Sequence, residues 1–185
     1  MKRIILTLTL AFATLIAPAQ NRQNVPAGMR MEIGSVEDND DVCSVFFYKD
    51  DDGTVGYYLS IGYQLDLFEF IGEESSSSIS HYDETCIYLG STLEEAIGEV
   101  DAILALFDKE VGTEFELPCR KLVGVERLGD RTTVKGTVVK RFLQAKRLCF
   151  LFATRGDHSA QVDLPKPSLR SIRGMLQFEQ RRQRW

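Results

Sequence analysis

The sequence contains four cysteines, whose thiols could form disulfides, bind a metal or act as nucleophiles. An even count in an oxidising compartment favours disulfides, and four thiols can pair in three ways. No two of them have the separation of two to four residues that is typical of a zinc site, so we expect no bound metal. The alternative is a set of small apolar core residues. The sequence predicts disulfide bonding, with the pairing left open, among Cys43, Cys86, Cys119 and Cys149.

The two histidines do not form a recognisable catalytic pair with a nucleophile. Cys86 follows His81 by five residues, but the two acidic residues between them would raise the thiol pKa, which disfavours a thiolate nucleophile. Asp157, His158 and Ser159 are adjacent, and adjacent side chains do not easily converge as a triad. There is also no Gly-x-Ser-x-Gly motif. The sequence therefore leans against an enzyme and predicts no cofactor; the alternative is a small secreted hydrolase whose site forms only in the fold.

An acidic run, Asp50-Asp51-Asp52-Gly53, offers oxygen ligands for calcium. An EF-hand loop placed on this run would need a ligand at Tyr48 and a bidentate glutamate at Leu59, and neither residue fits. Asp-Gly readily adopts the backbone conformation of a tight turn. We therefore expect a solvated hairpin turn here and no calcium site.

Charge is divided unevenly along the chain, whose net charge is −5. Residues 20–119 contain 4 basic and 22 acidic residues, a net charge of −18. Residues 120–185 contain 16 basic and 5 acidic residues, a net charge of +11. Such an asymmetry indicates either internal pairing of the two halves or a basic surface for an anionic partner.

The basic end of the chain is the candidate anion-binding site. Its arginines could hold phosphates or headgroups, with Trp185 at an interface. Basic residues at the end of a helix also stabilise the helix dipole without any partner, which is the competing interpretation. The candidate residues are Arg170, Arg173, Arg181, Arg182 and Arg184.

The first 19 residues have the pattern of an export signal. Lys2 and Arg3 precede an uncharged stretch over 4–16, and small residues then allow cleavage between Ala19 and Gln20. Thirteen helical residues span about 20 Å, less than the roughly 30 Å of a bilayer core. The sequence predicts a signal peptide over 1–19 and a flexible leader over 20–28. The mature chain, which has no transmembrane segment, is expected to be soluble and periplasmic or extracellular.

Two amphipathic helices are predicted from apolar spacing. Thr92 and Glu95 fit a capping box at the start of the first helix. Pro165 and Pro167 are suited to the first turn of the second. The apolar stripe of the first comprises Leu93, Ile97, Val100, Leu104 and Phe107, and that of the second Leu169, Ile172, Met175 and Leu176.

Strands fill most of the remaining chain. Residues 72–84, with four consecutive serines, are predicted to be a loop, and Gly129-Asp130 a turn. Residues 54–71 form one long strand, or two with a bend near Gly62. The predicted strands are 29–36, 42–49, 54–71, 85–89, 120–128, 132–143, 147–154 and 159–164.

These elements predict a single α+β domain over 29–185, an antiparallel sheet with two helices on one face. Cys43 and Cys119 are 76 residues apart, and so are Leu93 and Leu169. One interpretation is a degenerate tandem of two units, each of four strands and a helix, over 29–110 and 114–180; the other is coincidence in an apolar-rich chain.

The predicted role is a non-catalytic binding or assembly module outside the cytoplasm. Its partner is not identified by the sequence; the candidates are an anionic glycan, a lipid headgroup or another envelope protein. Binding of glycan or headgroups through the basic C-terminal half is a separate alternative.

Overall fold

The computed structural model describes residues 25–38, 41–70, 76–123, 127–140, 144–153 and 159–184. The predicted signal peptide over 1–19 lies outside these residues. The elements follow one another as β1 (Arg30–Asp38), β2 (Asp41–Lys49), β3 (Val55–Phe70), β4 (Ser76–Gly90), α2 (Leu93–Leu106), β5 (Glu114–Val123), β6 (Arg127–Lys140), β7 (Lys146–Ala153), β8 (Ser159–Pro165) and α3 (Lys166–Arg182).

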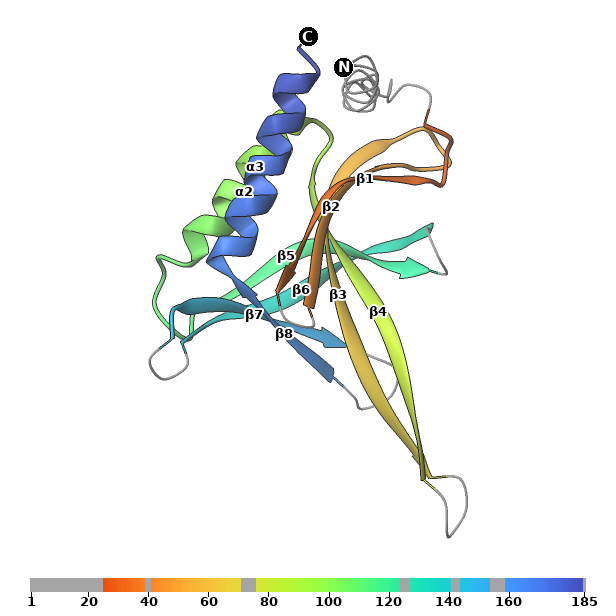
Figure 1. Ribbon diagram of the computed structural model, residues 1–185, viewed down its shortest axis with the longest axis vertical. Helices are drawn as coiled ribbons and strands as arrows, with labels where there is room; N and C mark the ends of the chain where they lie inside the picture. The colour runs from red at the N-terminus through yellow and green to blue at the C-terminus, as the bar shows by residue number, and fades with distance from the viewer. Residues whose placement is uncertain are drawn as a thin grey trace, which may run out of the picture.

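The eight strands form one antiparallel sheet in which every strand pairs with the next along the chain. The two helices lie side by side and antiparallel against one face of this sheet (Figure 1). The predicted architecture, an antiparallel sheet with two helices, is therefore confirmed. No helix in the described part of the chain is both long and apolar enough to span a bilayer.

Alternation along the strands gives the sheet two different faces. Cys43, Val45 and Phe47 of β2 point toward the helices and belong to the main core. We call this side the helix face. Phe46 and Tyr48 point the other way, into a smaller aromatic cluster on what we call the outer face. Burial on both faces explains why β2 reads as a nearly continuous apolar run.

Helix α2 begins with the predicted capping box. The Thr92 hydroxyl accepts a hydrogen bond from the Glu95 amide at 3.2 Å, and the Glu95 carboxylate accepts one from the Thr92 amide at 3.3 Å. The predicted stripe is rotated slightly, because Ala96 and Ile103 are fully buried whereas Ile97 and Leu104 are only partly buried. The small Ala96 side chain allows this side of α2 to pack closely on the core, although alanine adds little to an apolar sequence pattern.

Helix α3 packs against both α2 and the first strand. Its predicted apolar residues Leu169, Ile172 and Leu176 are completely buried. Met175 lies over Gly34 of β1, where an added Cβ would come within 2.6 Å of the methionine sulfur. The last helix thus closes the core against the beginning of the described chain.

The sheet changes direction between β4 and β5. These strands share only three residue pairs, Thr85–Ile87 with 119–121, and β5 and β6 cross β3 and β4 at a wide angle (Figure 1). The far edge of the sheet then curls back, so that the rings of Tyr63 and Phe152 stack with their centroids 4.5 Å apart. On the outer face, Arg120 and Leu128 of the β5–β6 hairpin contact Tyr48 of β2.

Two sequence predictions were wrong in this region. Residues 76–84 are not a loop but the first part of β4, which pairs with β3 in a continuous register down to Phe70 and Ser76. Gly129 and Asp130 are not a turn but lie inside β6. In both places strand pairing overrides the local preference of serine, glycine and aspartate.

Candidate functional site

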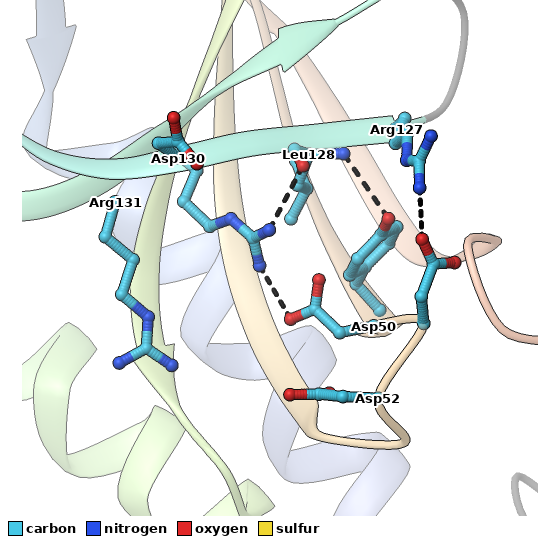
Figure 2. Close-up of a pocket in the computed structure, with 9 residues that line it drawn as sticks. Asp50, Asp52, Arg127, Leu128, Asp130 and Arg131 are labelled. Atoms are coloured by element: carbon cyan, nitrogen blue, oxygen red, sulfur yellow. Dashed lines mark hydrogen bonds and ion pairs between the residues drawn. The ribbon is translucent and has the colours of Figure 1, made fainter.

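A pocket of about 410 Å³ opens where the β2–β3 turn meets the β5–β6 hairpin (Figure 2). It lies on the outer face, since Tyr48 and Leu128 belong to the outer aromatic cluster. Its lining has four aspartates and three arginines. The lining residues are Tyr48, Asp50, Asp51, Asp52, Arg120, Arg127, Leu128, Asp130 and Arg131.

The floor of the pocket is the acidic turn that the sequence predicts. Gly53 donates to the Asp50 carbonyl at 2.9 Å and has a φ of 85°, a conformation that favours glycine. The Asp52 carboxylate accepts a hydrogen bond from the Thr54 amide at 2.8 Å. This bond, with a weaker contribution from Arg131, lowers the pKa of Asp52, so its carboxylate is ionised at neutral pH.

Arg120 of β5 is the most firmly held charge in the pocket. Its Nη1 donates to Asp50 Oδ2 at 2.7 Å and to the Tyr58 hydroxyl at 3.4 Å. Its Nε and Nη2 donate to the carbonyls of Gly129 and Leu128 at 2.6 and 3.0 Å. With 12% of its side chain exposed, this guanidinium joins three separate segments of the chain.

The outer aromatic cluster supports Arg120 from below. The guanidinium carbon lies 5.8 Å from the centre of the Tyr48 ring, and the Tyr48 hydroxyl accepts a hydrogen bond from the Leu128 amide at 3.4 Å. Tyr58 packs edge-on against Tyr48 with ring centroids 6.3 Å apart. The polar groups of this wall are therefore mutually satisfied by hydrogen bonds.

The rim of the pocket carries exposed charges of both signs. Arg127 forms an ion pair with Asp51. Asp52, Asp130 and Arg131 are exposed, and no ion pair with another described residue is found for them. The pocket can therefore present a carboxylate and a guanidinium to the same ligand.

Sequence reasoning found the acidic turn of this site but none of its arginines. Arg120 and Asp50 are 70 residues apart, so no local motif joins them. The opposite charges of the two chain halves were the available signal, because ion pairs connect these halves repeatedly. The pairs are Arg120–Asp50, Arg127–Asp51, Lys135–Glu116, Lys166–Asp108 and Arg173–Asp101.

The predicted disulfide bonds are not formed among the described residues. Cys43 in β2 and Cys119 in β5 both face the main core, but β3 and β4 lie between them, a separation of about 14 Å at the usual strand spacing. A disulfide needs Cα atoms within about 7 Å. Cys86 points to the outer face, and Cys149 lies two strands beyond β5.

The buried thiols are also poor nucleophiles. Burial raises the pKa of Cys43 to about 12 and that of Cys119 to about 11. Burial, followed by the nearby Glu84 carboxylate, also raises the pKa of Cys86. A thiol with a raised pKa is mostly protonated at neutral pH, so these three cysteines act as core residues.

The candidate anion-binding arginines all lie on or just after α3, but they differ in whether they form ion pairs. Arg173 forms two hydrogen bonds with Asp101 of α2, and Arg182 forms an ion pair with the buried Glu179 at 2.8 Å. Arg170, Arg181 and Arg184 are exposed. Trp185 lies outside the described residues.

The pocket-lining residues that the structure describes include no histidine. His81 lies in the β3–β4 hairpin, in register with Leu65, and His158 is outside the described part of the chain. Within the described ranges, no group of three histidine, cysteine, aspartate or glutamate side chains is arranged to hold a metal ion.

Comparison with known proteins identifies no function, so the functional assignment depends on the geometry of the site. No protein-family model, curated protein or solved structure matches the chain.

Proposed function

We propose that this chain is an exported, non-catalytic binding module whose pocket holds a small zwitterionic ligand. The observation that supports the proposal is the pairing of a hydrogen-bonded wall, built on Arg120, with a rim of opposite exposed charges. Asp52 would receive the ammonium group of the ligand, and Arg131 its carboxylate (Figure 2). A pocket of about 410 Å³ is large enough for a dipeptide or a molecule of similar size.

Binding fits this lining better than catalysis does. A general acid needs a carboxyl group whose pKa is raised, whereas the pKa of Asp52 is lowered by the Thr54 amide. The described lining residues include no serine, cysteine or histidine, so they supply no nucleophile next to a base.

The zwitterion proposal predicts that both charges of a ligand contribute to its affinity. Glycylglycine is expected to bind at least tenfold more tightly than N-acetylglycylglycine or glycylglycine amide. Each analogue loses one charge-assisted hydrogen bond, worth about 1.5–3 kcal/mol. Titrations followed by NMR amide shifts give the three affinities and show whether the shifts cluster around Gly53 and Arg131.

Two variants make this experiment specific to the rim. Arg131→Gln should weaken glycylglycine binding and remove the difference between the peptide and its amide. The control is Lys135→Gln. Lys135 lies on the same strand and pairs with Glu116 outside the pocket, so this change should leave all three affinities unchanged. Equal binding of the peptide and both analogues, or shifts elsewhere on the molecule, would contradict the proposal.

Export is the part of the proposal that rests on the N-terminal pattern. The order of basic, apolar and small residues predicts cleavage between Ala19 and Gln20. The secreted or periplasmic protein should therefore have the intact mass of residues 20–185. Recovery of the uncleaved chain from the cytoplasm alone would contradict it.

We also propose that the chain is a degenerate tandem of two four-strand-and-helix units. The order of four strands and one helix occurs twice, and the buried Leu93 and Leu169 each lie in the first turns of their helices. The spacing of 76 residues does not extend to the beginning of the units, because Cys43 lies in the second strand and Cys119 in the first strand of its series. Only the final strand and helix of each unit would keep the original spacing.

A further inference from the structure

The C-terminal turns of α3 expose an aromatic ring among arginines. Phe178 has 63% of its surface exposed, the largest value among the large hydrophobic residues of the described chain. Arg181 and Arg182 follow it by three and four residues and are exposed, as is Arg184. We call Phe178, Arg181, Arg182 and Arg184 the α3 patch. A phenylalanine so exposed on a well-packed helix needs a reason beyond the core.

The helical period separates this patch from the buried stripe. Leu169, Ile172 and Leu176 pack inward, whereas Phe178 and Arg181 lie on the opposite side of the helix at 100° per residue. At Gly174, one turn before Phe178, an added Cβ would meet no atom from outside its own helical turn within 4 Å. No other described element therefore covers this side of α3 at Gly174.

Not every arginine of α3 is available to a partner. Asp101 neutralises Arg173, and Glu179 pairs with Arg182. For Arg181 and Arg184, which are exposed, no ion pair with a described residue is found. Both follow the exposed ring at the C-terminal end of α3.

We propose that the α3 patch docks this protein on an anionic phospholipid surface. The arginines contact headgroup phosphates, and the Phe178 ring enters the boundary between headgroups and acyl chains. The ring favours a lipid surface over a purely polar polyanion, since it has no hydrogen-bonding group and gains from leaving water.

Charge elsewhere on the chain fixes the orientation. Residues 20–119 have a net charge of −18 and residues 120–185 a net charge of +11, so an anionic surface repels the first part of the chain and attracts the second. The pocket lies on the outer face, on the other side of the sheet from the helices (Figure 2). Docking through α3 therefore leaves the pocket open, and the two proposals can fail independently.

Cosedimentation with vesicles tests the docking. The protein that begins at Gln20 is mixed with vesicles of phosphatidylcholine alone or of phosphatidylcholine and phosphatidylglycerol in equal parts. We expect binding only to the anionic vesicles and a steep loss as salt is raised. Arg181→Gln together with Arg184→Gln should weaken partitioning by about 25-fold, at about fivefold per arginine. Phe178→Ala should weaken it by about tenfold.

A matched pair of substitutions separates the patch from general charge. Lys135→Gln together with Lys140→Gln removes two exposed charges from β6 and should leave partitioning unchanged. The proposal is overturned if this control loses as much vesicle binding as the arginine variant, or if the unmodified protein does not bind anionic vesicles. The protein could instead be retained on an anionic polysaccharide, equally with and without Phe178→Ala, and fail to bind vesicles. That result would identify a glycan as the partner and would also overturn the proposal.

Discussion

Replacing Arg120 by methionine is expected to lower the free energy of unfolding by about 2–3 kcal/mol, because it removes the charge-assisted hydrogen bonds of a partly buried ion pair. The substitution leaves the Asp50 carboxylate without its 2.7 Å partner and the carbonyls of Leu128 and Gly129 without their donor. Methionine fills much of the same volume, so the loss measures the polar contacts rather than a cavity. Denaturant titration at neutral pH gives the value.

Two controls test whether burial is the cause. Lys135→Met removes a cation from an exposed pair with Glu116, separated by 3.5 Å, and should change stability by less than about 0.5 kcal/mol. Combining Arg120→Met with Asp50→Leu should cost less than the sum of the single changes, since no unpaired charge remains. Strictly additive losses would show that Arg120 and Asp50 do not act as a pair.

The second large effect is expected at the interface between α2 and the sheet. Ile103→Ala should cost about 3–4 kcal/mol, because Ile103 is 1% exposed and belongs to the main core. Leu104→Ala removes a side chain of the same size from a partly buried position and should cost less than half as much. Thermal and denaturant unfolding of both variants give the comparison.

This pair decides which side of α2 faces the core. Ile172→Ala provides a reference from α3, where the side chain is completely buried and a loss similar to that of Ile103→Ala is expected. A larger loss at Leu104 than at Ile103 would mean that the helix packs on the stripe indicated by the sequence and not on the one seen in the structure.

The helices could be predicted because their signals are local. Thr92 and Glu95 are three residues apart, and the apolar positions of α3 repeat within two turns. The side of α2 that faces the core could not be predicted exactly, because Ala96 contributes little to an apolar pattern yet is completely buried. The first part of β4 was missed for a related reason. Its serines have no strand preference of their own, and only pairing with β3 makes this segment extended.

The site shows the same division between local and distant information. The turn at Asp50–Gly53 follows from its own residue types. The partners of Arg120 come from the β2–β3 turn, β3 and β6, and their meeting depends on the change of sheet direction where β4 pairs with β5. Nothing in the residues around Arg120 encodes that angle. The charge asymmetry indicated that the halves attract each other, but not which side chains meet.

The neighbour-to-neighbour order of the strands has a consequence for how the chain folds. Each hairpin can form as soon as its second strand is available, so most of the sheet assembles through loops of short length with little closure entropy. The contact of α3 with β1, including Met175 over Gly34, is different, because it joins the first and the last of the described elements. It can form only after residues 166–182 have been synthesised. A chain that ends before residue 166 would therefore lack the helix that covers β1, and docking of α3 is expected to be the last step that closes the core.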